Sequence, residues 1–226
     1  VSQGLIAYDK HKGQSADIIA NRIYHSFEYK DGLKKWLWGE DVTRYKVTWN
    51  SKEYIDYCDG IANPRRPYFF IGKRLLVREI TNPSIFAAIT SDELYNDPAV
   101  LIVLDNNGEY PLEVVLSILN SKLATFYHFN YSPKSTKGAF PKILVGDIKN
   151  FPLPILDKNI ASQLMGLVKE IELVKMKGSD ENTEHLENNI DYMVYHLYNL
   201  TYDEVLIVDP ETPITREEYE SFEFTE

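Results

Sequence analysis

Cysteine is nearly absent from this sequence, because Cys58 is the only one in 226 residues. A single thiol excludes an intrachain disulfide and a cysteine-rich metal cluster, and it suits a reducing cytoplasm. Long hydrophobic runs are also missing: the roughly 18 consecutive apolar residues of a membrane span occur nowhere. The length is sufficient for a sizeable core without covalent staples. These absences predict a soluble, cytoplasmic globular protein with no membrane partner.

Glycine motifs for nucleotides are missing as well. No G-x-G pair occurs, so neither a dinucleotide fingerprint nor a glycine loop for S-adenosylmethionine is present, and a Walker loop is absent. Asn63-Pro64 and Asn82-Pro83 do not continue into the Asn-Pro-Pro-aromatic motif with which amino-methyltransferases hold a flipped adenine. We interpret both dipeptides as turns. The sequence therefore predicts no cofactor site within this chain.

Catalytic and metal motifs are equally scarce. The five histidines lack metal-ligand spacing and no serine lies in G-x-S-x-G, so we predict no catalytic or metal-binding residue. His128 and His196 are interpreted as core-edge side chains or partners of helix dipoles. One loose pattern remains, because Asp17 followed by Glu28-x-Lys30 imitates the magnesium-binding residues of many restriction nucleases. Outward positions at the edge of an aromatic strand or helix explain Glu28 and Lys30 more simply.

Charge is distributed unevenly along the chain. The net charge is −10, yet residues 1–155 hold 19 basic and 17 acidic side chains, whereas residues 156–226 hold 5 and 17. Residues 30–78 carry 11 basic and 6 acidic groups, and residues 120–150 carry 5 and 1. Such windows suit a nucleic-acid ligand, since neutralisation of phosphates supplies most of the non-specific affinity. Scattered, solvated charge is the alternative interpretation.

Hydrophobic patterning predicts mainly strands and loops before residue 110. Alternating or continuous apolar runs of β-forming residues bounded by turn signals predict four strands. These strands are expected at residues 45–49, 68–71, 75–80 and 100–104.

Helical patterning dominates the rest of the chain. Pro111 begins a buried helix whose apolar residues recur to Phe126. Residues 151–155 form an extended boundary. Two amphipathic helices are expected after it, at residues 164–174 and 186–197, and they are expected to pack as an antiparallel pair. Capping boxes at Thr201 and Thr215 predict two short terminal helices. We predict an α+β fold, a curved and largely antiparallel sheet with packed helices, followed by a helical C-terminal tail. The expected domains are residues 1–155 for recognition and 156–226 for a tail that packs on them or on a partner.

Three features could carry a function. Trp36, Trp38 and Trp49 are interleaved with Arg44 and Lys46, which suits base stacking and phosphate contact or, alternatively, packing of large aromatics in a core. A polar, basic loop at residues 131–138 follows the buried helix, and it suits phosphate contact or is simply solvated. An arginine pair at residues 65–66 can offer guanidinium forks to guanine, although paired surface arginines are common.

The order of several short strings resembles a known family. They are GEDVTRY at 39–45, LLVREI at 75–80, LSILNSKL at 116–123, KGAFPK at 137–142, DIKNFPLP at 147–154, and IDYMVYHLY at 190–198 with LT at 200–201. In this order and spacing, the chain resembles the TaqI-like C-terminal specificity domain of adenine-specific DNA methyltransferases and type II restriction-modification enzymes over residues 1–207. The acidic segment after Val208 departs from the pattern.

The resemblance implies a target-recognition domain for double-stranded DNA. In that family the domain follows a catalytic methyltransferase domain, clamps duplex DNA against it, and lets an adenine flip into the catalytic pocket. The expected partners are therefore duplex DNA and a methyltransferase domain of the same polypeptide or of a partner subunit, and S-adenosylmethionine would bind in that domain. Because the numbering begins at Val1 rather than Met, we expect a fragment of a longer polypeptide.

The resemblance implies a scaffold role for the best-matching residues, Asn120 and Leu123 among them. We therefore assign DNA contact to less patterned cationic and hydroxyl side chains. The predicted DNA-binding residues are Lys134, Ser135, Thr136, Lys137, Arg65, Arg66, Arg44, Lys46, Lys142, Lys10 and Lys12.

Two other functions stay open. The tail helices could dock a methyltransferase or nuclease subunit, as coiled helices do in type I specificity subunits. An exposed apolar stripe would favour docking, and burial of both stripes in one core would favour plain structure. The chain could instead be a magnesium nuclease that uses Asp17 and Glu28.

Overall fold

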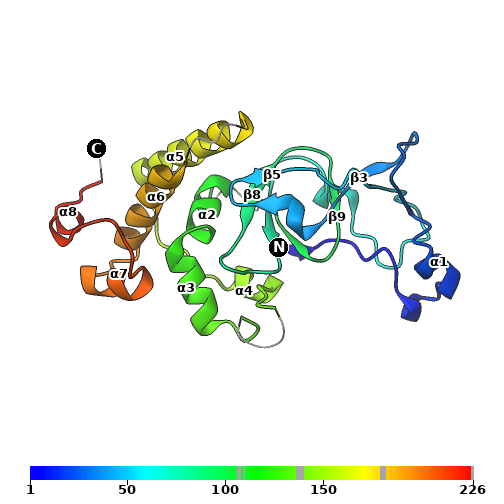
Figure 1. Cartoon of the computed structure of the whole chain (residues 1–226), viewed down its shortest axis with the longest axis horizontal. Helices are drawn as coiled ribbons and strands as arrows, with labels where there is room; N and C mark the ends of the chain where they lie inside the picture. Colours follow the sequence, from blue (N-terminus) through cyan, green and yellow to red (C-terminus); the bar gives the residue numbers. More distant parts are fainter. Residues whose placement is uncertain (106–107, 109, 136–139, 179–181, 225–226) are drawn as a thin grey trace.

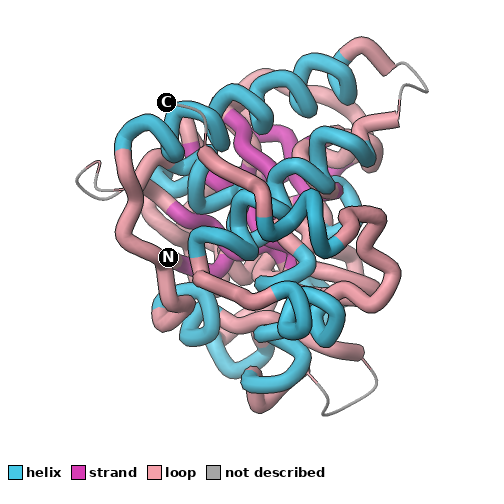
Figure 2. The backbone as a smooth tube through the Cα atoms, turned by 90° about the vertical axis from the view of Figure 1, so that its left-hand side faces the viewer, coloured by secondary structure: helices cyan, strands magenta, loops and turns pink. Residues whose placement is uncertain are grey.

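The computed structural model describes residues 1–105, 108, 110–135, 140–178 and 182–224. Strands and their connections occupy the middle of the molecule, short helix α1 lies at one end, and the C-terminal helices lie at the other (Figure 1). Seen from the C-terminal helices, the helical layer lies in front of the strands (Figure 2). The predicted α+β class, with helices gathered in the C-terminal part, is confirmed.

The described residues form short strands, single-turn 3₁₀ segments and helices. The strands are β1 (Ser2–Gln3), β2 (His25–Ser26), β3 (Lys34–Leu37), β4 (Val42–Thr43), β5 (Lys46–Val47), β6 (Tyr54–Ile55), β7 (Arg74–Arg78), β8 (Ala87–Thr90), β9 (Tyr95–Asn96) and β10 (Val100–Val103). The 3₁₀ segments are η1 (Lys10–Lys12), η2 (Gly39–Asp41) and η3 (Pro67–Phe69). The helices are α1 (Ala16–Ala20), α2 (Leu112–Leu119), α3 (Lys122–Tyr131), α4 (Val145–Lys149), α5 (Lys158–Met176), α6 (Glu184–Leu197), α7 (Tyr202–Val208) and α8 (Arg216–Glu220).

One antiparallel sheet, in the order β1-β10-β7-β8, lies between two hydrophobic cores. Side chains along a strand alternate between faces. Leu75 and Val77 of β7 therefore enter one core, whereas Leu76 between them enters the other. Because both faces are covered, β7 and β10 appear in the sequence as continuous apolar runs, and the strands predicted there are confirmed.

The first core lies between this sheet and the helices. It contains buried side chains of β7, β8 and β10 together with those of α2, α5 and α6. The second core is covered by a smaller sheet in the order β2-β6-β3-β9, in which only the β3–β9 pair is parallel. A hairpin, β4–β5, packs beside β8. The expectation of largely antiparallel pairing is confirmed.

The helix predicted from Pro111 to Phe126 is two helices. α2 ends at Leu119, and the side chain of Ser121 caps the start of α3 by accepting a bond from the Ala124 amide at 3.1 Å. The residue between them, Asn120, is fully buried; its side chain accepts from the Ala87 amide and donates to the Ala87 carbonyl, both at 3.0 Å. The apolar spacing continues across the junction, so periodicity alone did not show the break.

Two strand predictions are wrong in detail. Residues 68–69 belong to 3₁₀ segment η3 and residues 70–71 follow it, because Pro67 fits a first helical turn and Phe70 then turns inward to stack on Tyr95 at 4.4 Å. The strand expected from residue 45 begins only at Lys46, because Tyr45 has φ of +61° in the two-residue turn of the β4–β5 hairpin. The strand is correspondingly short.

The tail helices pack on the rest of the fold. The α5 and α6 stripes, including Leu164 and Ile190, enter the first core, and the two helices pack on each other. The capping boxes at Thr201 and Thr215 begin α7 and α8 as predicted. No helix within the described ranges combines the length and apolar character needed to cross a membrane.

The bridge from Asn120 to strand β8 predicts a clear stability effect. Asn120→Ala would leave the buried Ala87 amide without a partner, whereas the Ala87 carbonyl keeps a bond from the Tyr45 amide at 2.8 Å, so we expect a loss of roughly 1–3 kcal/mol in the free energy of unfolding. Urea titration followed by circular dichroism measures it. The control is Asn130→Ala at an exposed position on α3, where we expect a change within about 0.5 kcal/mol. Equal stability of both variants would show that the bridge is dispensable.

Candidate nucleic-acid interface

The loop after α3 presents one of the predicted cationic side chains. Lys134 is exposed, and its carbonyl accepts a bond from the Lys142 amide at 3.2 Å, which ties the two ends of the loop together. The Thr81 amide bonds the Pro141 carbonyl at 3.1 Å and thereby holds the loop against the main sheet. Lys142 is half-buried and pairs with Glu79 at 2.9 Å, so its charge is partly neutralised within the fold.

Of the other residues of this loop that were predicted to contact DNA, Ser135 is described by the structure. Ser135 is 2% exposed, and its hydroxyl donates to the carbonyls of Ser132 at 2.7 Å and Phe129 at 3.1 Å. This geometry gives Ser135 an internal role at the end of α3. Thr136 and Lys137, also predicted to contact DNA, lie outside the described residues.

A second cationic group lies at the α1 end of the molecule. Lys10 and Lys12 are exposed on η1, and Arg66 is exposed in the loop before η3, with Arg65 half-buried beside it. The Gln14 amide nitrogen joins the two segments by donating to the carbonyls of Ala7 at 2.9 Å and Gly60 at 2.7 Å. One backbone bond between Ala62 and Ala7 and two between Ile6 and Asn63 reinforce this junction. These bonds fasten together two cation-bearing segments that are about fifty residues apart in the sequence.

The two cationic groups do not form one site. Figure 1 places α4 and the end of α3 below the sheet, whereas α1 lies at the far end of the molecule. An interface that uses both must extend along the molecule rather than occupy one pocket. Lys46 belongs to neither group, because it is half-buried on β5.

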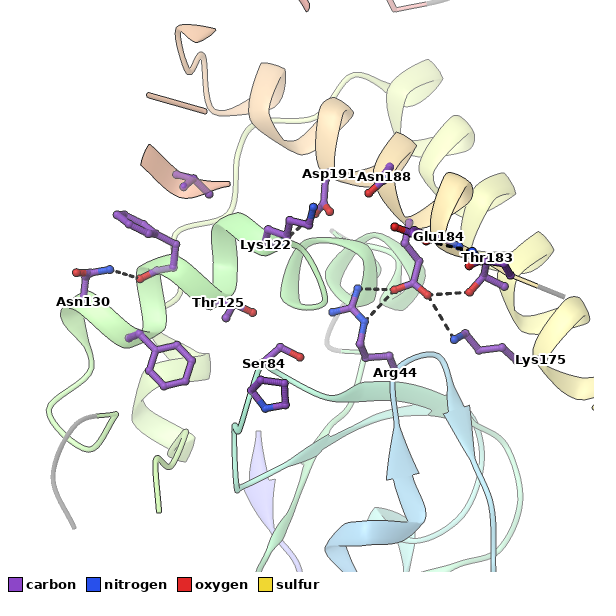
Figure 3. A pocket seen from close by; sticks show the side chains of 16 residues that line it. Arg44, Ser84, Lys122, Thr125, Asn130, Lys175, Thr183, Glu184, Asn188 and Asp191 are labelled. Carbon is purple, nitrogen blue, oxygen red and sulfur yellow. Dashed lines mark hydrogen bonds and ion pairs between the residues drawn. The ribbon is translucent and has the colours of Figure 1, made fainter. Parts of the chain in front are cut away.

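Arg44 has an internal role at the hairpin turn (Figure 3). Its guanidinium donates through Nε and Nη2 to Glu187 Oε2 at 2.9 and 2.6 Å, and it also bonds the Asn120 carbonyl. Glu187 in addition accepts from Thr183 at 2.8 Å and pairs with Lys175 at 3.3 Å. The hairpin is therefore fastened to α6, 143 residues further along the chain.

A cavity of about 750 Å³ adjoins this network. Its lining comes from the hairpin, the loop around Pro83, α3, and the facing ends of α5 and α6 (Figure 3). Asp191 lies in it almost fully buried, and its carboxylate accepts from the Lys122 amide at 2.8 Å. Burial raises the pKa of Asp191 from 3.8 to about 7, against the lowering effects of Lys122 and Arg44. The mixed charges of the lining give it no consistent attraction for a polyanion.

The tryptophan cluster serves packing. Trp36 is 2% exposed in the second core, and Trp38 and Trp49 are half-buried against it. Arg22 lies over the Trp38 ring at 5.3 Å and Lys35 over the Trp49 ring at 4.9 Å. The core-packing interpretation of the cluster is confirmed, with cations covering its outer rings.

Residues of the nuclease-like pattern lie on the surface. Asp17 is exposed in the first turn of α1, and Glu28 is exposed after β2. Among the described residues, no three His, Cys, Asp or Glu side chains gather as a metal site.

Comparison with known proteins defines the family. The sequence profile of the TaqI-like C-terminal specificity domain matches residues 34–153, more than half of the chain. The chain belongs to this family. Its fold resembles that of MmeI, a Type IIL restriction-modification enzyme solved in complex with DNA, with a TM-score of 0.61 and 10% sequence identity. The match covers 98% of this chain and 35% of the MmeI chain. A search of curated proteins gave no match.

The buried carboxyl of Asp191 predicts a pH effect on stability. Its pKa is higher in the folded chain than in the unfolded chain, so ionisation favours unfolding as pH rises from about 4 to 7. Asp191→Asn removes this penalty and keeps an oxygen acceptor for the Lys122 amide. We expect the variant to gain stability over the wild type by up to about 1.4 kcal/mol for each pH unit in that window. Urea titrations at pH 5, 6, 7 and 8 measure the gap, and a gap that does not change with pH would contradict the assignment.

Proposed function

We propose that this chain reads a double-stranded DNA site for an adenine-specific methyltransferase of a restriction-modification system and positions that site for base flipping. The observation that carries the proposal is the family match over residues 34–153, which include β7, β8 and β10 of the main sheet, α2, α3 and the loop that follows. The similarity of fold to an enzyme solved with DNA supports it.

The chemistry is assigned to another part of the enzyme. The chain spans about a third of the length of MmeI. Methyl transfer and binding of S-adenosylmethionine would belong to a methyltransferase domain of the same polypeptide or of a partner subunit, in the cytoplasm. It is physically reasonable that site recognition and methyl transfer belong to different domains, because an adenine must leave the duplex stack before its amino group can react. We expect this chain alone to have no enzymatic activity.

The proposed DNA contacts are the cations that the fold leaves accessible. Lys134, Lys10, Lys12 and Arg66 are exposed, and an exposed cation loses little hydration when it approaches a phosphate. Arg65 and Lys142 are half-buried beside exposed cations, Lys46 is half-buried on β5 apart from both groups, and Thr136 and Lys137 remain in the proposal from sequence alone. Arg44 and Ser135 are assigned instead to holding the hairpin and the end of α3.

The alternative of a docking tail has less support. Apolar side chains of both tail helices, such as Val168 and Val194, are buried in the core that the sheet shares. This burial accounts for the amphipathic pattern by structure alone. A few apolar side chains at the end of α5, Leu173 and Met176, remain exposed.

Salt dependence of DNA binding tests the proposal. We expect the double variant Lys134→Ala, Lys137→Ala to bind duplex DNA more weakly. The slope of the logarithm of its affinity against the logarithm of the salt concentration should be shallower by about 0.9 for each phosphate that the variant no longer neutralises. Fluorescence anisotropy of a labelled duplex at several salt concentrations measures both. The matched control is Lys169→Ala with Lys177→Ala, two exposed lysines of the tail, which should leave the slope unchanged. Equal slopes for both double variants would remove the loop from the interface.

The nuclease alternative has its own test. We expect the purified chain to leave supercoiled plasmid intact with magnesium, because Asp17 and Glu28 are exposed without a third described carboxylate, histidine or cysteine beside them. Agarose gels of a time course give the result. Nicking that disappears in Glu28→Ala would establish the nuclease.

A further inference from the structure

A second cavity adjoins the start of the proposed DNA-binding loop, at Tyr131, Ser132 and Pro133. It has a volume of about 380 Å³ and is formed by the end of α3, the residues that follow it, and α4. This size is within the range of small-molecule sites, about 300–1,000 Å³. Neither the family match nor the fold similarity assigns a ligand to it.

Aromatic rings form its walls. Tyr127 and Tyr131 stack at 4.9 Å with an interplanar angle of 25°, and Phe151 meets Tyr127 edge-on at 5.3 Å. Tyr131 is 70% exposed, so its ring extends the wall toward solvent. Flat aromatic groups are the ligands that stack best on such an exposed tyrosine ring.

Two polar atoms of the lining are buried and lack a partner among the described residues. The His128 imidazole bonds the Thr81 hydroxyl through Nε2 at 2.9 Å, which leaves Nδ1 unpaired, and Ser132 Oγ is the other atom. Burial lowers the pKa of His128, so its ring is neutral at pH 7. A neutral imidazole offers a donor or an acceptor at Nδ1, depending on its tautomer, and the serine hydroxyl offers either.

The carboxylate of the lining is already engaged. Asp147 accepts a bond from the Leu144 amide at 2.7 Å at the start of α4. The nearest loop carries the exposed cation Lys134, two residues after Ser132. Aromatic walls, two unpaired polar atoms and a cation on the adjoining loop correspond to the face, the edge and the phosphate of a nucleotide.

We propose that this cavity receives a single nucleobase that has left the duplex stack. The proposal rests on the function proposed above and adds a site for an extrahelical base on the reading module itself. The base would stack on Tyr131 and bond its polar edge to His128 Nδ1 and Ser132 Oγ. Holding such a base would stabilise the opened duplex and so assist flipping elsewhere in the enzyme.

A duplex with one bulged 2-aminopurine tests the site, and the same duplex without the bulge is the reference. We expect the chain to bind the bulged duplex more tightly and to quench its 2-aminopurine emission through stacking. Tyr131→Ala should weaken binding of the bulged duplex by roughly 5- to 150-fold, the equivalent of about 1–3 kcal/mol per stacked base, and should abolish quenching. Ser132→Ala should weaken it less and keep the quenching.

Tyr29→Ala is the control, because Tyr29 is also exposed and also packs on one tyrosine, Tyr54, but lies in the loop after β2, beside the smaller sheet. It should leave affinity and quenching unchanged. Equal affinity of the wild type for the bulged and intact duplexes without quenching would overturn the base site and leave duplex recognition standing. A loss of quenching in both tyrosine variants would also overturn it. Failure to bind either duplex would contradict the proposed function and the base site together.

Discussion

Burial of both faces of β7 and β10 is the constraint on which the rest of the structure depends. Leu75 and Val77 enter the core beneath the helices, and Leu76 enters the core beneath the smaller sheet. Because one strand contributes to both cores, the two layers cannot slide past each other without exposing apolar area, at about 25 cal/mol for each Å². The proposed DNA-binding loop and the second cationic group are therefore parts of one packed body.

A short series of polar contacts to the main sheet holds the loop after α3 in position. Asn120 bonds β8 at the point where α2 ends, Ser121 starts α3 in a new direction, and α3 then leads to the loop. At the far end of the loop, the Pro141 carbonyl returns to Thr81 next to β7. Arg44 holds the hairpin, the α2–α3 junction and α6 together through Glu187 and the Asn120 carbonyl. These buried bonds give a structural role to Asn120 and Arg44, which lie in two of the strings that resemble the family.

The elements that could be predicted from the sequence are those that depend on interactions between neighbouring residues. The apolar runs of β7 and β10 and the capping boxes at Thr201 and Thr215 depend on neighbours within a few residues, and each gave the element expected. The α2–α3 break was missed because the apolar spacing continues through Asn120, and the partner that requires the break, Ala87, is 33 residues away. The role of Arg44 was missed for the same reason, since Glu187 belongs to the tail. The sequence placed Lys134 in a loop, but the aromatic cavity that adjoins this loop depends on the packing of α3 against α4.

The central claim is that cationic loops of this chain contact duplex DNA while the tail helices hold the fold. Amide hydrogen exchange, measured with and without a random-sequence duplex at low salt, tests it directly, because phosphate contacts are present whatever the sequence. The account predicts added protection in residues 131–142 and around η1 and the Arg66 loop, with α5, α6, α7 and α8 unchanged. Protection confined to those four helices, or none at all, would contradict it.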